Sequence, residues 1–144
     1  MFRSNHPDDR GKILSLLWLF AILNMLFRDI HEMTMAATIN EILSGYVNGN
    51  PMSESVLFFG AFAVELLLLV FLLSGLLAPY WARLLNLVMV PVAILGTFYI
   101  APNDPDDYFF AVVEICAFIT IFVMAWRWQT APRATRQIGG HHAT

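Results

Sequence analysis

Four long apolar runs make up most of the chain, and they restrict its folds to those that a lipid bilayer accommodates. A helix needs roughly 20 apolar residues to cross about 30 Å of hydrocarbon, and four segments meet this requirement. The composition agrees, because 58% of the 144 residues are hydrophobic and 13% are charged, against about 25% charged in soluble domains. The predicted spans are Lys12–Met33, Ser53–Leu77, Tyr80–Ile100 and Pro105–Trp128.

The connections between the predicted spans are short, which favours antiparallel neighbours. We therefore expect an all-α, four-helix transmembrane bundle with up-down-up-down topology, formed by residues 12–128. Residues 1–11 form an N-terminal tail. Residues 129–144 form a C-terminal tail that is expected to be flexible, since it contains Gly139-Gly140-His141-His142.

The distribution of basic residues predicts the orientation of the bundle, because lysine and arginine in short flanking segments are retained in the cytoplasm. The connections Thr34–Met52 and Ala101–Asp104 contain neither residue, so we assign them to the outer side of the membrane. Both termini are then cytoplasmic. Seven of the eight basic residues support this orientation: Arg3, Arg10, Lys12, Arg83, Arg127, Arg133 and Arg136.

A short helix is predicted in the connection between the first two spans. Thr38 and Glu41 have the spacing of a capping box, in which each side chain accepts a hydrogen bond from the backbone N–H of the other. Gly45 suits the position that follows a helix C-terminus. Apolar residues recur at helical spacing and predict that this helix lies along the outer surface of the bilayer. These residues are Ile39, Ile42, Leu43 and Tyr46.

Three carboxylates, Asp29, Glu65 and Glu114, interrupt the apolar runs. A charge at the bilayer centre costs about 2.5 to 3.5 kcal/mol, so each carboxylate is expected to face protein, water or a partner. From the helical rise, Glu65 lies roughly 18 Å and Glu114 roughly 13 Å from the outer surface, and Asn24 reaches a similar depth from the cytoplasmic side. We expect Asn24, Glu65 and Glu114 to point into the bundle.

Arg28 is the only lysine or arginine on the outer side of the predicted membrane. Asn24, Arg28 and His31 share one helix face, whereas Asp29 is turned about 100° away. Arg28 can therefore reach either of the two buried glutamates. Two interpretations remain open: a structural ion pair accompanied by a protonated carboxyl, and a polar pocket that binds a ligand or carries a proton.

Asn86, near the cytoplasmic end of the third span, is a further polar position inside the apolar runs. An amide in hydrocarbon is usually committed to a hydrogen bond between helices, so Asn86 is either structural or part of a ligand site. The candidate ligand-binding residues are Asn24, Arg28, Asp29, Glu65, Asn86 and Glu114.

The counts of cysteine, histidine and charge exclude several kinds of site. The single cysteine, Cys116, excludes an internal disulfide, a Cys-x-x-Cys pair and an iron–sulfur cluster. His31 is the only histidine near a span and no nucleophile motif accompanies it, so no metal site and no Ser/His/Asp nucleophile system are predicted, and the catalytic residues of any enzyme stay unknown. The net charge of −3 argues against a nucleic-acid partner. The sequence identifies no cofactor.

Several short motifs lie along the spans. They are Leu14-Ser15-Leu16-Leu17-Trp18, Asn24 with Asp29, Glu65, Arg83-Leu84-Leu85-Asn86, Tyr108-Phe109-Phe110 before Glu114, and Ala125-Trp126-Arg127-Trp128. With these motifs the segment Ile13–Trp128 resembles a family of uncharacterised four-span proteins of the bacterial inner membrane, broadly similar to the DoxX-like group. The resemblance implies that the three carboxylates and Asn86 are important, and it implies no activity. Arg28 departs from the small residue expected before the aspartate.

Three functions are compatible with these features. The first is a non-enzymatic membrane protein that binds a small amphipathic molecule, such as a lipid or a quinone, through the buried carboxylates. The second is a membrane-embedded isomerase or oxidoreductase that uses Glu65 or Glu114 as acid and base. The third is an accessory subunit of a larger membrane complex. The partners compatible with the sequence are the bilayer, a small amphipathic ligand, and either a second copy of the chain or a larger complex. A polar pocket open to lipid favours the first two, and a flat apolar outer stripe favours the third.

Overall fold

The computed structural model describes residues 7–47, 49–99 and 105–128, which form four long helices, one short helix and a two-stranded hairpin. Each long helix is long and apolar enough to cross a membrane, which indicates an integral membrane protein. Residues 1–6 of the predicted N-terminal tail and the whole predicted C-terminal tail, residues 129–144, lie outside the described residues. The elements are α1 Pro7–Glu32, α2 Ala36–Leu43, β1 Tyr46–Val47, β2 Asn50–Pro51, α3 Glu54–Leu76, α4 Pro79–Tyr99 and α5 Pro105–Trp126.

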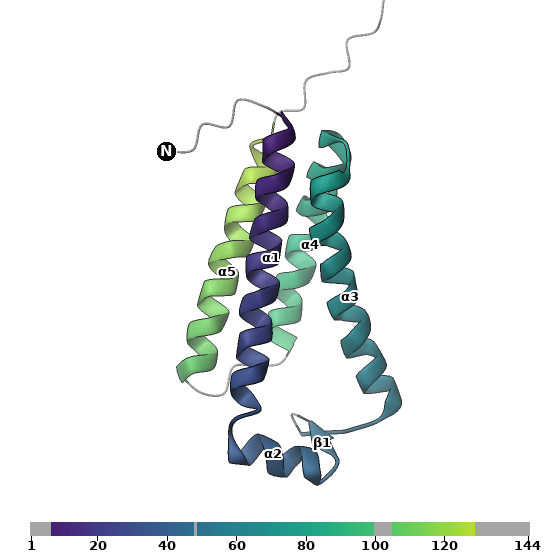
Figure 1. Ribbon diagram of the computed structural model, residues 1–144, viewed down its shortest axis with the longest axis vertical. Helices are drawn as coiled ribbons and strands as arrows, with labels where there is room; N and C mark the ends of the chain where they lie inside the picture. The colour runs from purple at the N-terminus through teal and green to yellow at the C-terminus, as the bar shows by residue number, and fades with distance from the viewer. Residues whose placement is uncertain (1–6, 48, 100–104, 129–144) are drawn as a thin grey trace, which may run out of the picture.

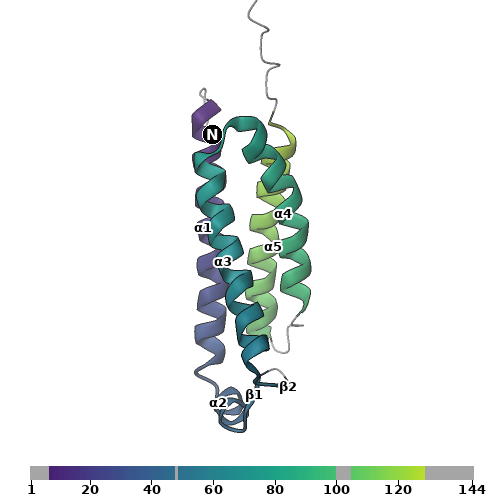
Figure 2. The same cartoon turned by 90° about the vertical axis from the view of Figure 1, so that its right-hand side faces the viewer.

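The four long helices pack as an up-down-up-down bundle, as the sequence predicts (Figure 1). α1 packs between α3 and α5, and α4 contacts the same two helices on the other side. α1 begins and α5 ends at one end of the bundle, which we call the terminal end. Figure 2 shows α2 and the hairpin at the opposite end, which we call the α2 end. There the two strands pair antiparallel, with Tyr46 opposite Pro51.

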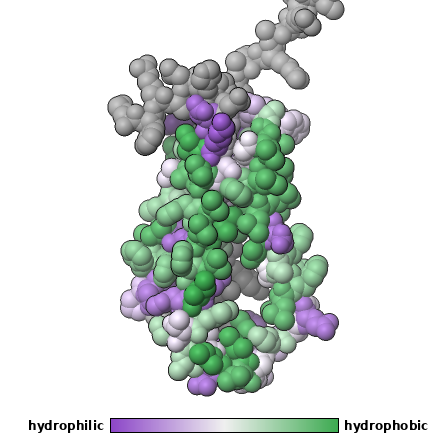
Figure 3. Space-filling model, in the orientation of Figure 1, coloured by the Kyte–Doolittle hydropathy of each residue, from purple (hydrophilic) through white to green (hydrophobic). Residues whose placement is uncertain are grey.

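The surface of the bundle is suited to a bilayer. Figure 3 shows hydrophobic residues over most of its length, with hydrophilic residues concentrated toward the two ends. Large apolar side chains are exposed on each long helix, including Phe20, Phe62, Leu95 and Val112. Lipid chains rather than water would surround such a surface, because only hydrocarbon tolerates so much exposed apolar area.

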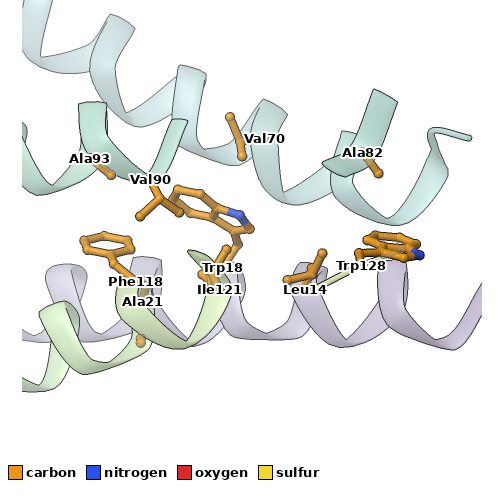
Figure 4. Packing of buried hydrophobic residues seen from close by; sticks show 11 residues of the cluster. Leu14, Trp18, Ala21, Val70, Ala82, Val90, Ala93, Phe118, Ile121 and Trp128 are labelled. Carbon is orange, nitrogen blue, oxygen red and sulfur yellow. The ribbon is translucent and has the colours of Figure 1, made fainter. Parts of the chain in front are cut away.

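The core of the bundle combines large aromatic rings with small residues (Figure 4). The ring centroids of Trp18 and Phe118 lie 5.5 Å apart in a tilted arrangement. Lipid chains are as apolar as these side chains, so close packing holds membrane helices together where water exclusion cannot. The other members of the buried cluster are Leu14, Ala21, Val70, Ala82, Val90, Ala93, Ala117, Ile121 and Trp128.

α1 and α3 approach closely near the terminal end, where two glycines leave room for the contact. A Cβ at Gly11 would lie 3.0 Å from the carbonyl oxygen of Ser74, and a Cβ at Gly75 would lie 3.3 Å from Ser15 Oγ. This approach lets the Ser15 hydroxyl donate a 2.7 Å hydrogen bond to the carbonyl of Phe71 on the neighbouring helix. Small residues and hydrogen bonds of this kind are typical of packed membrane helices.

The short helix α2 is present in the predicted connection, but its predicted capping box is wrong. Met35 occupies the N-cap position, with extended backbone and no side-chain cap. Thr38 therefore lies inside the first turn, where its hydroxyl comes too late in the chain to cap the helix. Glu41 instead accepts a 2.5 Å hydrogen bond from the N–H of Gly49, between the two strands. Gly45 follows the C-cap residue Ser44, as predicted, and has a φ of +83°.

The first half of α3 has no buried residue. Residues 54–65, which we call the splayed segment, are all exposed, and the buried positions of this helix, Val70 and Ser74, come only after it. Figure 1 shows α3 leaning away from α1 toward the α2 end. The segment is nevertheless helical, and the Ser53 hydroxyl caps it by accepting a hydrogen bond from the N–H of Val56. One side of the bundle is therefore left open at the α2 end.

Candidate functional site

Two layers of polar side chains cross the bundle, and the layer nearer the terminal end is centred on Asn86 of α4, which is fully buried. Asn86 Oδ1 accepts hydrogen bonds from Trp18 Nε1 at 2.6 Å and from Ser74 Oγ at 3.3 Å. Asn86 Nδ2 donates to Ser74 Oγ at 3.0 Å and to the Ala82 carbonyl at 2.7 Å. Both amide donors and both oxygen lone pairs are thus occupied. This geometry favours a structural role for Asn86, linking α1, α3 and α4.

The second layer, nearer the α2 end, is centred on Glu114 of α5, which is also fully buried. Asn24 Nδ2 of α1 donates to Glu114 Oε1 at 3.3 Å and to the Phe110 carbonyl at 3.0 Å. Thr97 Oγ1 of α4 lies 3.4 Å from Glu114 Oε2. Strong hydrogen bonds to a carboxylate are about 2.7–2.9 Å long, so the contacts of Glu114 are all loose. We call Asn24, Arg28, Thr97 and Glu114 the Glu114 cluster.

Arg28 supplies the positive charge of the Glu114 cluster, and its side chain is only 11% exposed. Its Nη1 lies 3.7 Å from Glu114 Oε2, and its Nε lies 3.9 Å from Asp29 Oδ1. Both distances permit an ion pair and exceed the range of a hydrogen bond. In the part of the chain that the structure describes, Arg28 Nε and Arg83 Nε are the buried side-chain nitrogens without a hydrogen-bond partner. The guanidinium is therefore available to another acceptor.

Glu65 is not part of the Glu114 cluster, and the prediction that it points into the bundle is wrong. Its side chain is exposed on α3. It precedes Val70 by five residues and Ser74 by nine, which places it about 140° and about 180° around the helix from these two buried positions. With Glu65 on the outer face of α3, the Glu65 and Glu114 carboxyls do not face each other. The position of Glu65 along the helix predicts how deep it lies in the membrane, but it does not predict the direction of the side chain. Apolar residues occur on every face of α3, so its sequence does not predict which face is buried.

The remaining predicted residues lie at the α2 end of α1. Asp29 is 59% exposed and turned away from Glu114, as helix geometry predicts. His31 was expected on the same face as Arg28, and its Nε2 lies 2.7 Å from Asp106 Oδ2. This pair joins the end of α1 to the beginning of α5. It therefore braces the two helices that carry Arg28 and Glu114.

Three residues of the polar layers were missed from sequence: Trp18, Ser74 and Thr97. A signal for Thr97 was present, because Asn86, Val90 and Thr97 lie at helical spacing on one face of α4. The pairing of Trp18 with Asn86 had no such signal, since it joins residues of two helices that are 68 positions apart in sequence.

The Glu114 cluster combines a carboxyl, a guanidinium, an amide and a hydroxyl in an apolar surrounding. Such a set can hold the polar group of a ligand by hydrogen bonds, and a carboxyl in it can carry a proton. Among residues 7–47, 49–99 and 105–128, no three His, Cys, Asp or Glu side chains are placed to hold a metal ion.

Comparisons with known proteins assign no activity to the chain. No curated protein and no solved structure matches the chain. A family model matches residues 2–135, which includes all four long helices and both polar layers. The chain therefore belongs to DUF6326, a family of unknown function.

Proposed function

We propose that this protein is a non-enzymatic membrane protein that binds a small amphipathic molecule, such as a lipid or a quinone, between its helices. The proposal depends on one observation: the buried Nε of Arg28 has no hydrogen-bond partner among the described residues. Buried polar groups are almost always paired, so an unpaired buried donor calls for an explanation. An acceptor atom of the ligand would supply the missing partner.

The side chains around Arg28 favour an uncharged oxygen as that acceptor. Asn24 Nδ2 already donates to Phe110 and Glu114, so the guanidinium is the donor left for a ligand. The charge of Arg28 is balanced by Glu114, 3.7 Å away. A quinone or ester carbonyl can accept from the guanidinium without adding a second negative charge to a buried site.

The open side of the bundle supports a place for the apolar part of the ligand. Phe59 and Ala63 precede Val70 by eleven and seven residues, so both lie within about 20° of its direction on α3. Val70 is buried, yet Phe59 is 68% exposed and Ala63 is exposed. Phe59 and Ala63 thus face the bundle but are not covered by another helix. A lipid-like tail could lie along this side, with the splayed segment as one wall.

The enzymatic alternative is weakened by the position of Glu65. Acid and base roles divided between Glu65 and Glu114 would require both carboxyls to reach one ligand, and Glu65 faces away. Proton transfer by Glu114 alone would still need a molecule bound at the same cluster. Binding is therefore the property to test first.

In this proposal the protein lies in the bacterial inner membrane with both termini in the cytoplasm, and its fold is broadly similar to that of the DoxX-like group. The side is supported by the positions of the basic residues. Arg10 and Arg127 meet at the terminal end, where Arg10 Nη1 donates to the Arg127 carbonyl at 3.4 Å. Arg83 lies near the same end, at the beginning of α4.

Native mass spectrometry of the protein released from lipid nanodiscs tests the proposal, with a benzoquinone carrying a ten-carbon tail as the added probe. We expect the wild-type protein to retain the probe or a co-purified molecule of defined mass. The Arg28→Gln/Glu114→Gln double variant removes both charges together, which avoids an unpaired buried charge. It should bind the probe at least about tenfold more weakly, since a hydrogen bond to a charged group contributes about 1.5–3 kcal/mol.

Lys12→Gln is the matched control, because Lys12 is basic and exposed on the same helix. This variant should bind the probe as the wild type does. Absence of any bound molecule on the wild-type protein, or equal binding by the double variant, would contradict the proposed function.

A further inference from the structure

Glu65 is exposed at the middle of a membrane-spanning helix. It is the central residue of α3, eleven residues from Glu54 and eleven from Leu76. The helical rise places it about 17 Å from either end, which is the depth of the bilayer centre. A carboxyl at this depth is costly when it faces lipid and needs a polar partner.

The face of α3 that carries Glu65 points away from the bundle. Glu65 lies about 180° around the helix from the buried Ser74. The large neighbours on this face are also exposed: Phe58 is 65%, Phe62 58% and Leu72 50% exposed. Among the described residues, no hydrogen bond or ion pair reaches the Glu65 carboxyl. The described part of the chain therefore supplies no partner for this carboxyl, and a second molecule can supply one.

We propose that this outward face of α3 is the contact between two copies of the chain, related by a twofold axis along the membrane normal. We call it the Glu65 face, and its members are Phe58, Ala61, Phe62, Glu65, Leu69 and Leu72.

Symmetry favours a second copy over a different protein. Two parallel copies of α3 place their residues at equal depth, so Glu65 meets the partner's Glu65 without any further requirement on sequence. A protonated carboxyl of one copy donates to the carboxyl of the other, so the two acids satisfy each other. Ala61 lies one turn from Glu65 on the same face, and a small residue there lets the two helices approach closely.

Cysteine cross-linking in native membranes tests the contact. In a Cys116→Ser background, Ala61→Cys and Leu72→Cys lie on the Glu65 face and should form covalent dimers on oxidation. Val92→Cys is the control, since Val92 is 48% exposed on α4 and comparable to Leu72 in exposure. We expect little dimer from it. Dimers that form as readily through Val92→Cys, or no dimer through either α3 position, would overturn the proposal.

Energy transfer between labelled copies, followed as the protein is diluted in liposomes, tests the carboxyl itself. Glu65→Leu should weaken dimerisation about tenfold, because it removes hydrogen bonds between helices. Glu65→Gln should remain within about threefold of the wild type, since two amides can also pair. Both variants should fold, because the side chain is exposed. Dimerisation that is unchanged in Glu65→Leu would overturn the proposed pairing.

The Glu114 cluster lies inside the bundle, away from the Glu65 face. Ligand binding can therefore fail while the dimer contact holds, and the dimer contact can fail while ligand binding holds.

Discussion

Glu114 and Arg28 form a buried pair in which neither charge is well satisfied. Glu114 is fully buried and its contacts are 3.3 Å or longer, while Arg28 Nε has no hydrogen-bond partner among the described residues. Asn86 is the opposite case, since each of its polar atoms is paired at 2.6–3.3 Å. The two polar layers thus differ in hydrogen bonding although both are buried. Full pairing suits a structural role, and incomplete pairing suits a binding site.

A double-mutant cycle measures the coupling of this pair. Arg28→Gln and Glu114→Gln should each lower the free energy of unfolding by about 3–5 kcal/mol, because each leaves one buried charge uncompensated. The double variant should lose less than the sum, with a coupling of about 1–3 kcal/mol. Titration with SDS, followed by circular dichroism on protein in micelles, provides the measurement. Glu65→Gln is the control and should change little. Additive losses would show that the two charges do not interact.

At the scale of elements, α3 has two halves with different surroundings. Its second half packs closely on α1 around Gly75 and carries the buried Val70 and Ser74. Its first half, the splayed segment, has every side chain exposed. Few buried contacts mean a low free energy of local opening, so the splayed segment is the part of the bundle best able to move aside for a ligand.

Two glycine substitutions compare the close α1–α3 contact with the splayed segment. Gly11→Ala places a Cβ 3.0 Å from the carbonyl oxygen of Ser74, which is backbone and cannot swing away. We expect a loss of about 1–3 kcal/mol in the free energy of unfolding, as for other overpacked contacts. Gly60→Ala is the control, because a Cβ there meets nothing within 4 Å. It should be neutral or stabilising by up to about 1 kcal/mol through helix propensity. Equal losses in both variants would contradict the close α1–α3 contact.

At the scale of the whole molecule, the orientation in the membrane determines from which side the Glu114 cluster is reached. In a Cys116→Ser background, Ser44→Cys reports on the α2 end and Arg127→Cys on the terminal end, and both positions are exposed. An impermeant maleimide should label Ser44→Cys in intact cells and Arg127→Cys only after lysis, because basic residues are retained in the cytoplasm. The reverse labelling pattern would mean that the bundle is inverted.

Much of the architecture follows from the sequence alone. The length and hydropathy of the four runs predict the spans, because crossing a bilayer is a requirement on each segment by itself. The spacing of Asn24 and Arg28 predicts that they share a face, and both contact Glu114. The sequence also predicts that Asp29 points about 100° away from Arg28, because consecutive residues on a helix are separated by a fixed angle.

Only the tertiary structure decides how the helices are rotated against one another. The rise per residue predicts similar depths for Glu65 and Glu114, whereas the direction of each side chain depends on which helix face packs on a neighbouring helix. Apolar residues occur on every face of α3, so its sequence does not predict which face is buried. Contacts with α1 place Val70 inside the bundle and Glu65 outside it. The pairing of Asn86 with Trp18 likewise exists only once α1 and α4 are brought together.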